Sequence, residues 1–275
     1  MLSEVIACAN QKGGVGKTTT VINLAAYLAL LGRRVLVVDL DPQGNATSGL
    51  GLGRDASAGS IYPALLERAE TRALARQTQI ENLWMVPSGA DLAGAEVELI
   101  GVNQRERRLQ QALAGIREEF DFILLDCPPA VGLLTVNALT AADGVLVPIQ
   151  CEYYALEGLS QLLSTINLVR DNLNPRLRLA GVLLTMYDAR TTLSADVAAE
   201  VRRHLGSSVF DAIVPRSVRL AEAPSYGRPI ARYSPESRGA QAYRALAAEL
   251  IQRYPSTAGT TTAAAVAMPE MVAGA

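Results

Sequence analysis

The residue types best suited to chemistry stand together in KGGVGKTT, residues 12 to 19, directly after the apolar run Val5–Ala9. The glycines let backbone N–H groups turn toward phosphate oxygens, and a helix that begins there adds partial positive charge. Lys17 is suited to bridge the β- and γ-phosphates of a nucleotide, and the Thr18 hydroxyl to bind Mg²⁺. The strand before it and the helix after it favour a phosphate-binding loop over a chance glycine-rich turn.

One residue of this loop has no place in the usual pattern. That pattern has glycine five positions before Gly16, where this chain has Gln11, and a lysine, Lys12, comes next. Lys17 alone can serve the bound phosphates, so a second cation at the mouth of the loop requires a different role. The loop is therefore a lysine-bearing variant whose extra cation has a separate task.

Three aspartates follow apolar runs that are expected to be strands. Asp39 is the last residue of Val35–Asp39, and Asp41 follows two residues later. Asp126 is the last residue of Phe122–Asp126. Ligands of open parallel sheets bind at the carboxyl ends of strands, so these side chains are expected near the loop. Asp126 has the pattern of a carboxylate that holds Mg²⁺ through water, while Asp39 and Asp41 could order Mg²⁺ or position an attacking water. Ordinary capping of a strand end by aspartate is the alternative.

Composition argues against several other kinds of chemistry. The 275 residues carry 25 basic and 27 acidic side chains, so binding to nucleic acid would need a local patch of positive charge. Cys8, Cys127 and Cys151 are too far apart to suggest pairing or a metal site, which is typical of a reducing cytoplasm. A single histidine, His204, leaves little material for His-based triads or metal sites. Neither a signal peptide nor an apolar run of membrane-spanning length is seen.

The elements that must position these groups follow from the hydrophobic pattern. Short continuous runs rich in Val, Ile and Leu predict strands that are buried on both faces. The expected strands are Val5–Ala9, Val35–Asp39, Leu83–Val86, Phe122–Asp126, Gly144–Ile149, Leu179–Thr185 and Ser208–Ile213. Amphipathic stretches between and after them predict helices at Thr18–Leu31, Gln104–Glu119, Leu156–Leu173, Leu193–Leu205 and Arg238–Arg253.

The alternation of strands and helices predicts an α/β fold, with a mostly parallel twisted sheet and helices on both faces. One domain is expected over residues 1–254. The residues from 255 to 275 are mostly Ala, Thr and Gly, with one charged residue, Glu270, so they predict a disordered tail.

Six blocks of the sequence, in order over about residues 3–253, resemble the ParA/Soj family of partition ATPases, which carry a deviant Walker A loop. The blocks are NQKGGVGKTTT (Asn10–Thr20), DLDPQGNATSGLG (Asp39–Gly51), DCPP (Asp126–Pro129), QCEYYALEGL (Gln150–Leu159), LLTMYDARTTLS (Leu183–Ser194) and VPRSVRLAEAPSYGRPI (Val214–Ile230). The resemblance implies the three-layer fold of P-loop NTPases and an ATPase that uses ATP and Mg²⁺.

The resemblance also implies roles for the residues already singled out. The implied nucleotide-binding residues are Lys12, Gly13, Gly14, Val15, Gly16, Lys17, Thr18 and Thr19. Lys12 would reach across an ATP-bound homodimer to the phosphates of the partner subunit, where its charge stabilises the transition state only after dimerisation. Asp41 would orient the hydrolytic water, so the implied catalytic residues are Lys12, Lys17 and Asp41. Thr18, Asp39 and Asp126 would hold or support Mg²⁺.

A further implication is that the ATP-bound dimer binds double-stranded DNA without sequence preference. The matching positions are Arg190 and Arg219, with Arg216 as a nearby candidate, and a solvated surface charge is the alternative for each. The implied biology is chromosome or plasmid segregation with a ParB-type partner, which together with DNA stimulates a weak intrinsic hydrolysis. Hydrolysis would return the dimer to monomers, and the cytoplasmic protein would associate with the nucleoid.

Three other classes of protein share parts of these patterns. A MinD-like ATPase of cell division needs a basic amphipathic C-terminal helix, and no residue after Arg253 is basic, so no membrane attachment is expected. An iron–sulfur reductase needs two suitably placed cysteines per subunit, and Cys127 has no matching partner. A non-enzymatic scaffold would show no Mg²⁺-dependent hydrolysis of ATP.

Overall fold

A mostly parallel β-sheet runs through the computed structural model, which describes residues 3–53, 59–152 and 155–254. Its strands are β1 (Glu4–Cys8), β2 (Val35–Asp39), β3 (Arg76–Gln77), β4 (Leu83–Val86), β5 (Phe122–Asp126), β6 (Gly144–Gln150), β7 (Arg178–Tyr187) and β8 (Val209–Pro215). In the described residues their order across the sheet is β3-β4-β2-β5-β1-β6-β7-β8, and only the β3–β4 pairing is antiparallel. The predicted fold class is therefore confirmed.

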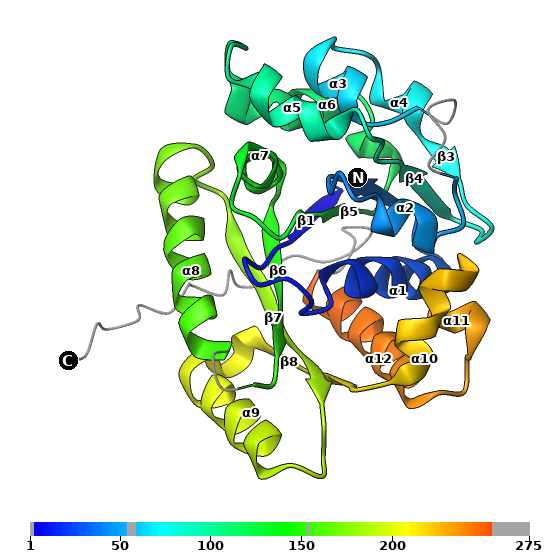
Figure 1. Ribbon diagram of the computed structural model, residues 1–275, viewed down its shortest axis with the longest axis vertical. Helices are drawn as coiled ribbons and strands as arrows, with labels where there is room; N and C mark the ends of the chain where they lie inside the picture. Colours follow the sequence, from blue (N-terminus) through cyan, green and yellow to red (C-terminus); the bar gives the residue numbers. More distant parts are fainter. Residues whose placement is uncertain (1–2, 54–58, 153–154, 255–275) are drawn as a thin grey trace.

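Helices cover both faces of the sheet (Figure 1). They are α1 (Lys17–Leu30), α2 (Asn45–Gly49), α3 (Tyr62–Leu66), α4 (Thr71–Leu74), α5 (Leu92–Leu99), α6 (Arg108–Ala114), α7 (Leu133–Ala141), α8 (Ala155–Asn172), α9 (Thr192–Leu205), α10 (Val218–Glu222), α11 (Ile230–Tyr233) and α12 (Arg238–Arg253). Helices α3 and α5 to α9 share one buried apolar cluster with the sheet, whereas α1, α2 and α10 to α12 share the other. The sheet and the helices packed on each of its faces are the three layers expected from the sequence.

The seven strands predicted from apolar runs are all present, each within two residues at either end. Strands β2 and β5 are buried at every position, which is why their sequences are continuously apolar rather than alternating. The sequence does not predict β3, because two exposed residues carry no hydrophobic pattern.

The helix predicted over Gln104–Glu119 is wrong in its extent. The structure has a 3-10 helix at Arg105–Arg107, then α6, then a 3-10 helix at Arg117–Glu119. The side chain of Asn137 donates to the carbonyl of Arg105 (2.7 Å) and accepts from the N–H of Leu109 (3.1 Å). A side chain from α7 thus forms hydrogen bonds with backbone groups at the start of the segment. Gly115 is the C-cap of α6.

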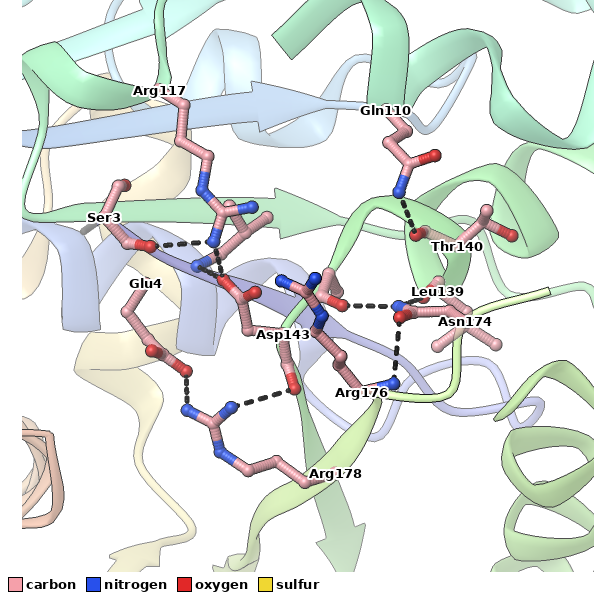
Figure 2. Close-up of polar contacts among 12 residues, drawn as sticks. Ser3, Glu4, Gln110, Arg117, Leu139, Thr140, Asp143, Asn174, Arg176 and Arg178 are labelled. Atoms are coloured by element: carbon pink, nitrogen blue, oxygen red, sulfur yellow. Dashed lines mark hydrogen bonds and ion pairs between the residues drawn. The ribbon is translucent and has the colours of Figure 1, made fainter. Parts of the chain in front are cut away.

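The amino ends of the central strands are joined by a polar network (Figure 2). The carboxylate of Asp143 accepts from the N–H of Val5 (2.9 Å) and pairs with Arg117. Arg178 pairs with Glu4 and also donates to the carbonyl of Asp143 (3.3 Å). This network ties β1, β6 and β7 together at the edge of the sheet opposite to the phosphate-binding loop.

The predicted tail, residues 255–275, lies outside the described residues. Within the described ranges, no helix is both long enough and apolar enough to cross a membrane. Cys8, Cys127 and Cys151 are free thiols in buried positions.

Candidate functional site

The three sequence signals lie side by side at the carboxyl edge of the sheet. The loop Lys12–Thr18 follows β1, while Asp39 ends β2 and Asp126 ends β5. In the sheet register Asp126 is the neighbour of Cys8 on one side and of Asp39 on the other. The fold therefore brings the phosphate loop and both strand-end carboxylates to adjacent strands, as expected for a ligand site in a parallel sheet.

The loop itself is shaped by left-handed backbone and by contacts from neighbouring strands. Gly14 and Gly16 have φ of 75° and 90°, which other residues rarely adopt, and Gly16 precedes the first residue of α1. The side chain of Asn10 donates to the carbonyl of Pro148 (2.7 Å) and accepts from the N–H of Lys12 (2.9 Å). These two contacts of Asn10 fix the start of the loop.

Inside the loop, backbone carbonyls face the protein rather than a ligand. The carbonyl of Val15 accepts from the hydroxyl of Thr185 in β7 (2.9 Å), and that of Thr19 accepts from the side chain of Asn23 (2.7 Å). With those carbonyls bonded inside, the N–H groups at the start of α1 are left for an anion.

The two lysines of the loop have different environments. Lys17 is 7% exposed, and its ammonium folds back to donate to the carbonyl of Lys12 (3.2 Å). Lys12 points outward, with 45% of its side chain exposed, and its Nζ lies 3.3 Å from a carboxylate oxygen of Glu152. Lys17 is thus fixed inside the loop, while Lys12 is held only by a surface ion pair of the kind that contributes about 1 kcal/mol or less.

Gly13 has no structural reason to be glycine. Its φ is not positive, and a Cβ added there would meet no atom of the described chain within 4 Å. A side chain at this position would instead project into open space at the mouth of the loop. The absence of a Cβ therefore fits a site where an external group, such as phosphate, approaches the backbone closely.

Asp39 is buried and fully engaged with its own loop. One carboxylate oxygen accepts from the backbone N–H (2.8 Å) and the hydroxyl (2.7 Å) of Thr47, and the other accepts from the N–H of Asp41 (3.1 Å). Burial raises the pKa of Asp39 to about 6, and the bonds from Thr47 act in the opposite direction. In this state Asp39 organises the loop, so its role toward Mg²⁺ stays a prediction.

Asp126 is the opposite case. It is 0% exposed, and neither of its carboxylate oxygens has a hydrogen-bond partner among the described residues. Burial, followed by the charge of Asp39, raises its pKa well above the usual range, while Thr18 and Lys17 lower it. Two buried, unpaired oxygens next to Thr18 fit a hydrated Mg²⁺ held through water.

The site has no ready-made cage for a bare metal ion. In the residues that the structure describes, no group of three or more His, Cys, Asp or Glu side chains could hold one. Mg²⁺ keeps several waters and is usually bound by one or two protein groups plus substrate phosphates, so a Thr–Asp pair suits it.

Asp41 lies just beyond Asp39 and is 7% exposed. Its carboxylate accepts from the N–H of Gln43 (3.0 Å), and its carbonyl accepts from the hydroxyl of Ser88 (2.7 Å). The N–H of Ser88 in turn donates to the hydroxyl of Thr47 (2.9 Å). The segment that carries Asp41 is thus pinned to the loop after β4, as a water-positioning group would require.

The predicted DNA-binding arginines lie on the same edge, beyond β7 and β8. Arg190 is 86% exposed and makes a bidentate pair with Asp188 (2.9 and 2.7 Å), which holds the pKa of that carboxyl far below its usual range. In α10, Nη1 of Arg219 lies 3.1 Å from a carboxylate oxygen of Glu222. Nη2 of Arg216 lies 3.6 Å from a carboxylate oxygen of Glu152. Each arginine therefore already has an acidic neighbour that a phosphate would have to displace.

Sequence reasoning missed the residues that support the site. Thr47 and Ser88 give no spacing signal, because each acts through a contact that only the fold creates. Glu152 is equally remote in sequence from Lys12. Asp188 could have been found, since it stands two residues before Arg190.

Comparisons with known proteins agree with this geometry. A family model described as an AAA domain matches residues 3–179. The sporulation initiation inhibitor protein Soj of Bacillus subtilis is 53% identical over 249 residues, which make up 90% of this chain and 98% of that protein. The chromosome partitioning protein ParA of Myxococcus xanthus is 54% identical over 252 residues, which make up 92% of this chain and 89% of that protein.

A solved structure has the same fold. The crystal structure of cobyrinic acid a,c-diamide synthase from Mycobacterium smegmatis, with bound ATP analog and magnesium, is 42% identical in sequence. Its TM-score is 0.81, and the match covers 93% of this chain and 97% of that one.

Proposed function

The chain belongs to the Soj and ParA family of chromosome-partitioning ATPases, and from this premise we propose that it is an ATPase whose ATP-bound dimer binds DNA and drives segregation. The resemblance found in the sequence is confirmed by these relatives. The proposal rests on one observation above all: the loop carries two lysines, one buried and fixed, the other outward-facing and loosely held.

ATP is the substrate and Mg²⁺ the metal, as in the magnesium-bound neighbour that carries an ATP analog. The backbone from Lys12 to Thr19 would hold the phosphates together with the Lys17 ammonium. Thr18 and Asp126 would hold Mg²⁺, with Asp39 in support. When bound, Mg²⁺ neutralises charge on the phosphate oxygens.

Lys12 acts across the dimer in this proposal. Its exposed ammonium is free to exchange Glu152 for phosphates held by a second subunit, at a cost of about 1 kcal/mol or less. A cation supplied in this way stabilises the developing charge only when two subunits face each other. Asp41, pinned through Ser88, would orient the attacking water. Hydrolysis then removes the ligand that joins the subunits, and the dimer returns to monomers.

DNA binding in this proposal uses Arg190 and Arg219, which follow β7 and β8 on the edge that carries the phosphate loop. Two arginines on each of two subunits make about four phosphate contacts, for a slope of log K against log salt of roughly −3.6. Binding of this strength is reversible and gains from dimerisation, because the dimer doubles the patch. Nucleotide state thereby sets the time spent on DNA, and on the nucleoid.

The partner in this proposal is a ParB-type centromere-binding protein. It and DNA would stimulate a weak intrinsic hydrolysis, and the cargo would be a chromosome or a plasmid. Support for this step comes from the family alone, since the relative from Myxococcus xanthus is named as a chromosome partitioning protein.

The test is DNA binding by the full chain with a non-hydrolysable ATP analogue and Mg²⁺, measured over a series of salt concentrations. We expect the double variant Arg190→Ala, Arg219→Ala to lose at least about tenfold in affinity and to have a flatter salt slope. Arg203→Ala is the matched control, because Arg203 is exposed and paired with Glu200 just as Arg219 is with Glu222. An unchanged affinity and slope in the double variant would refute the assignment of these arginines.

A further inference from the structure

A cavity of about 470 Å³ lies away from the phosphate loop, between α3, α4 and α6. In Figure 1 these helices lie together at the top of the view, and α1, which begins at the loop, lies below them. No residue from Lys12 to Thr19 lines the cavity. Its size is that of a site for a small molecule, about 300 to 1,000 Å³.

Arg108 forms part of the wall and is 3% exposed. Its Nε donates to the carbonyl of Leu65 and its Nη2 to that of Leu66 (3.0 Å), so it closes the C-terminal end of α3. Both partners are neutral carbonyls. Among the residues that the structure describes, no Asp or Glu forms an ion pair with this buried guanidinium, which stays charged at any physiological pH.

A second arginine lines the same cavity. Arg68 also lines the cavity, and its backbone is left-handed, with φ of 60°, which is uncommon for a residue with a side chain. Burial and then the charge of Arg68 lower the pKa of Arg108, and both residues line this one cavity. In the described part of the chain Arg68 makes no ion pair either. A third arginine of the lining, Arg72, is already paired with Glu119.

The lining contains one acid, Glu70, and it does not pair with Arg68 or Arg108 in the described structure. Two guanidiniums line the cavity without a carboxylate between them, and the uncompensated charge is costly at Arg108, which is buried, rather than at Arg68, which is exposed. The same arrangement becomes favourable when a multiply charged anion lies between them, because planar guanidinium forks match phosphate oxygens in geometry and charge.

We propose that this cavity is a second anion site, which binds a small phosphomonoester with its phosphate between Arg68 and Arg108. The rest of the ligand would occupy the remaining volume beside Thr71 and Gln111. The site is separate from the nucleotide site and would be filled independently of ATP.

The test uses inorganic phosphate and glycerol phosphate as probes, titrated into the full chain by calorimetry at constant ionic strength. The parent and every variant carry Lys17→Ala, which weakens anion binding at the phosphate loop, so a difference between variants reports on the cavity. We expect saturable binding of both probes, with the glycerol phosphate tighter. Arg68→Gln should weaken it by about tenfold or more, and Arg68→Lys by less. Because Arg68 is exposed, these variants are expected to fold, whereas Arg108→Gln removes a helix cap.

Arg76→Gln is the matched control, since Arg76 is exposed, lies nearby and does not line the cavity. Equal binding by the parent and Arg68→Gln would overturn the proposal. So would equal losses in Arg68→Gln and Arg76→Gln, which would reflect general charge, or the absence of saturation by either probe. A change in the chemical shift of the Arg108 Nε–H upon phosphate addition, seen by NMR in the parent and absent in Arg68→Gln, would support the proposal independently.

Discussion

At the scale of single residues, the loop separates two tasks that one lysine cannot perform together. Lys17 is fixed by the carbonyl of Lys12 and is nearly inaccessible, which suits a permanent phosphate ligand. Lys12 is exposed and held only by Glu152, which suits a group that must move to a new partner. The sequence predicts that Lys12 is unusual, but the pairing with Glu152 depends on the fold.

Gly13 offers a test of whether the loop is shaped for an external group. Since the chain leaves open space around it, Gly13→Ala should keep the free energy of unfolding or raise it by up to about 1 kcal/mol. ATP turnover should nevertheless fall by about tenfold or more, because the added methyl group lies where the phosphate or the partner subunit must approach. Denaturant unfolding and a phosphate-release assay measure the two effects separately.

Gly101→Ala provides the control, because Gly101 is exposed and also has no atom within 4 Å of its added Cβ. It should change the free energy of unfolding by no more than Gly13→Ala does and should leave ATP turnover unchanged. If Gly13→Ala lowered stability and left turnover intact, the glycine would serve the fold and the loop geometry would have to be reinterpreted.

Thr47 is the residue on which the two aspartates depend. Its hydroxyl donates to Asp39 and accepts from the N–H of Ser88, and it is 0% exposed. Thr47→Val keeps the shape but leaves the buried N–H of Ser88 without its partner and Asp39 with one hydrogen bond fewer, for a loss of about 2 to 3 kcal/mol in the free energy of unfolding. Thr47→Ser keeps the hydroxyl and should lose only about 1 kcal/mol. Urea unfolding distinguishes them, and equal losses would rule out the hydroxyl as the cause.

At the scale of elements, the strands follow from the sequence because burial on both faces leaves a plain apolar signature. The helices follow from the sequence only where one face is exposed to solvent. Helix α7 is nearly all buried, so its sequence LLTVNALTA has no amphipathic period to detect. The segment after Gln104 is amphipathic, but Asn137 from α7 breaks its first turn, and no local pattern shows such a contact.

The same holds for the candidate site. The loop, Asp39, Asp41 and Asp126 could be predicted because parallel strands must bring their carboxyl ends to one edge. The contacts that hold these side chains in place, from Thr47 to Asp39 and from Glu152 to Lys12, join residues that the sequence pattern does not connect. The cavity between α3, α4 and α6 was not predictable, since its lining comes from two segments that are about 40 residues apart in sequence.

The amino edge of the sheet makes stability depend on pH. Burial raises the pKa of Glu4 from 4.5 to about 7, and Arg178 only partly opposes this. The folded chain therefore binds the Glu4 proton more tightly than the unfolded chain. This contribution is complete below pH 4.5 and is lost as the pH rises to about 7, by up to about 1.4 kcal/mol per pH unit.

Glu4→Gln removes the titratable carboxyl group and should therefore remove this dependence of stability on pH. The difference in unfolding free energy between the parent and Glu4→Gln should fall steadily from pH 4.5 to pH 7 in denaturant titrations. The exposed Glu81→Gln, by contrast, should follow the parent at every pH. Parallel curves for the parent and Glu4→Gln would contradict the account of this edge.

At the scale of the whole molecule, the two edges of the sheet carry different kinds of residues and contacts. The amino edge is closed by ion pairs between Glu4, Arg178, Asp143 and Arg117, so it serves stability. The carboxyl edge carries the loop, the unpaired Asp126 and the exposed Arg190 and Arg219. The proposed nucleotide-binding and DNA-binding groups thus lie on one edge, so the dimer that we propose would also bring the arginines of two subunits together.

The central claim is that ATP joins two subunits through Lys12. The most direct measurement is sedimentation velocity of the full chain with Mg²⁺ in ADP, in ATP and in a non-hydrolysable analogue, beside Lys12→Gln. The account predicts a monomer in ADP and a dimer in the analogue. Lys12→Gln should bind the analogue through Lys17 yet remain monomeric. A parent that stays monomeric in every nucleotide, or a Lys12→Gln variant that dimerises as the parent does, would contradict it.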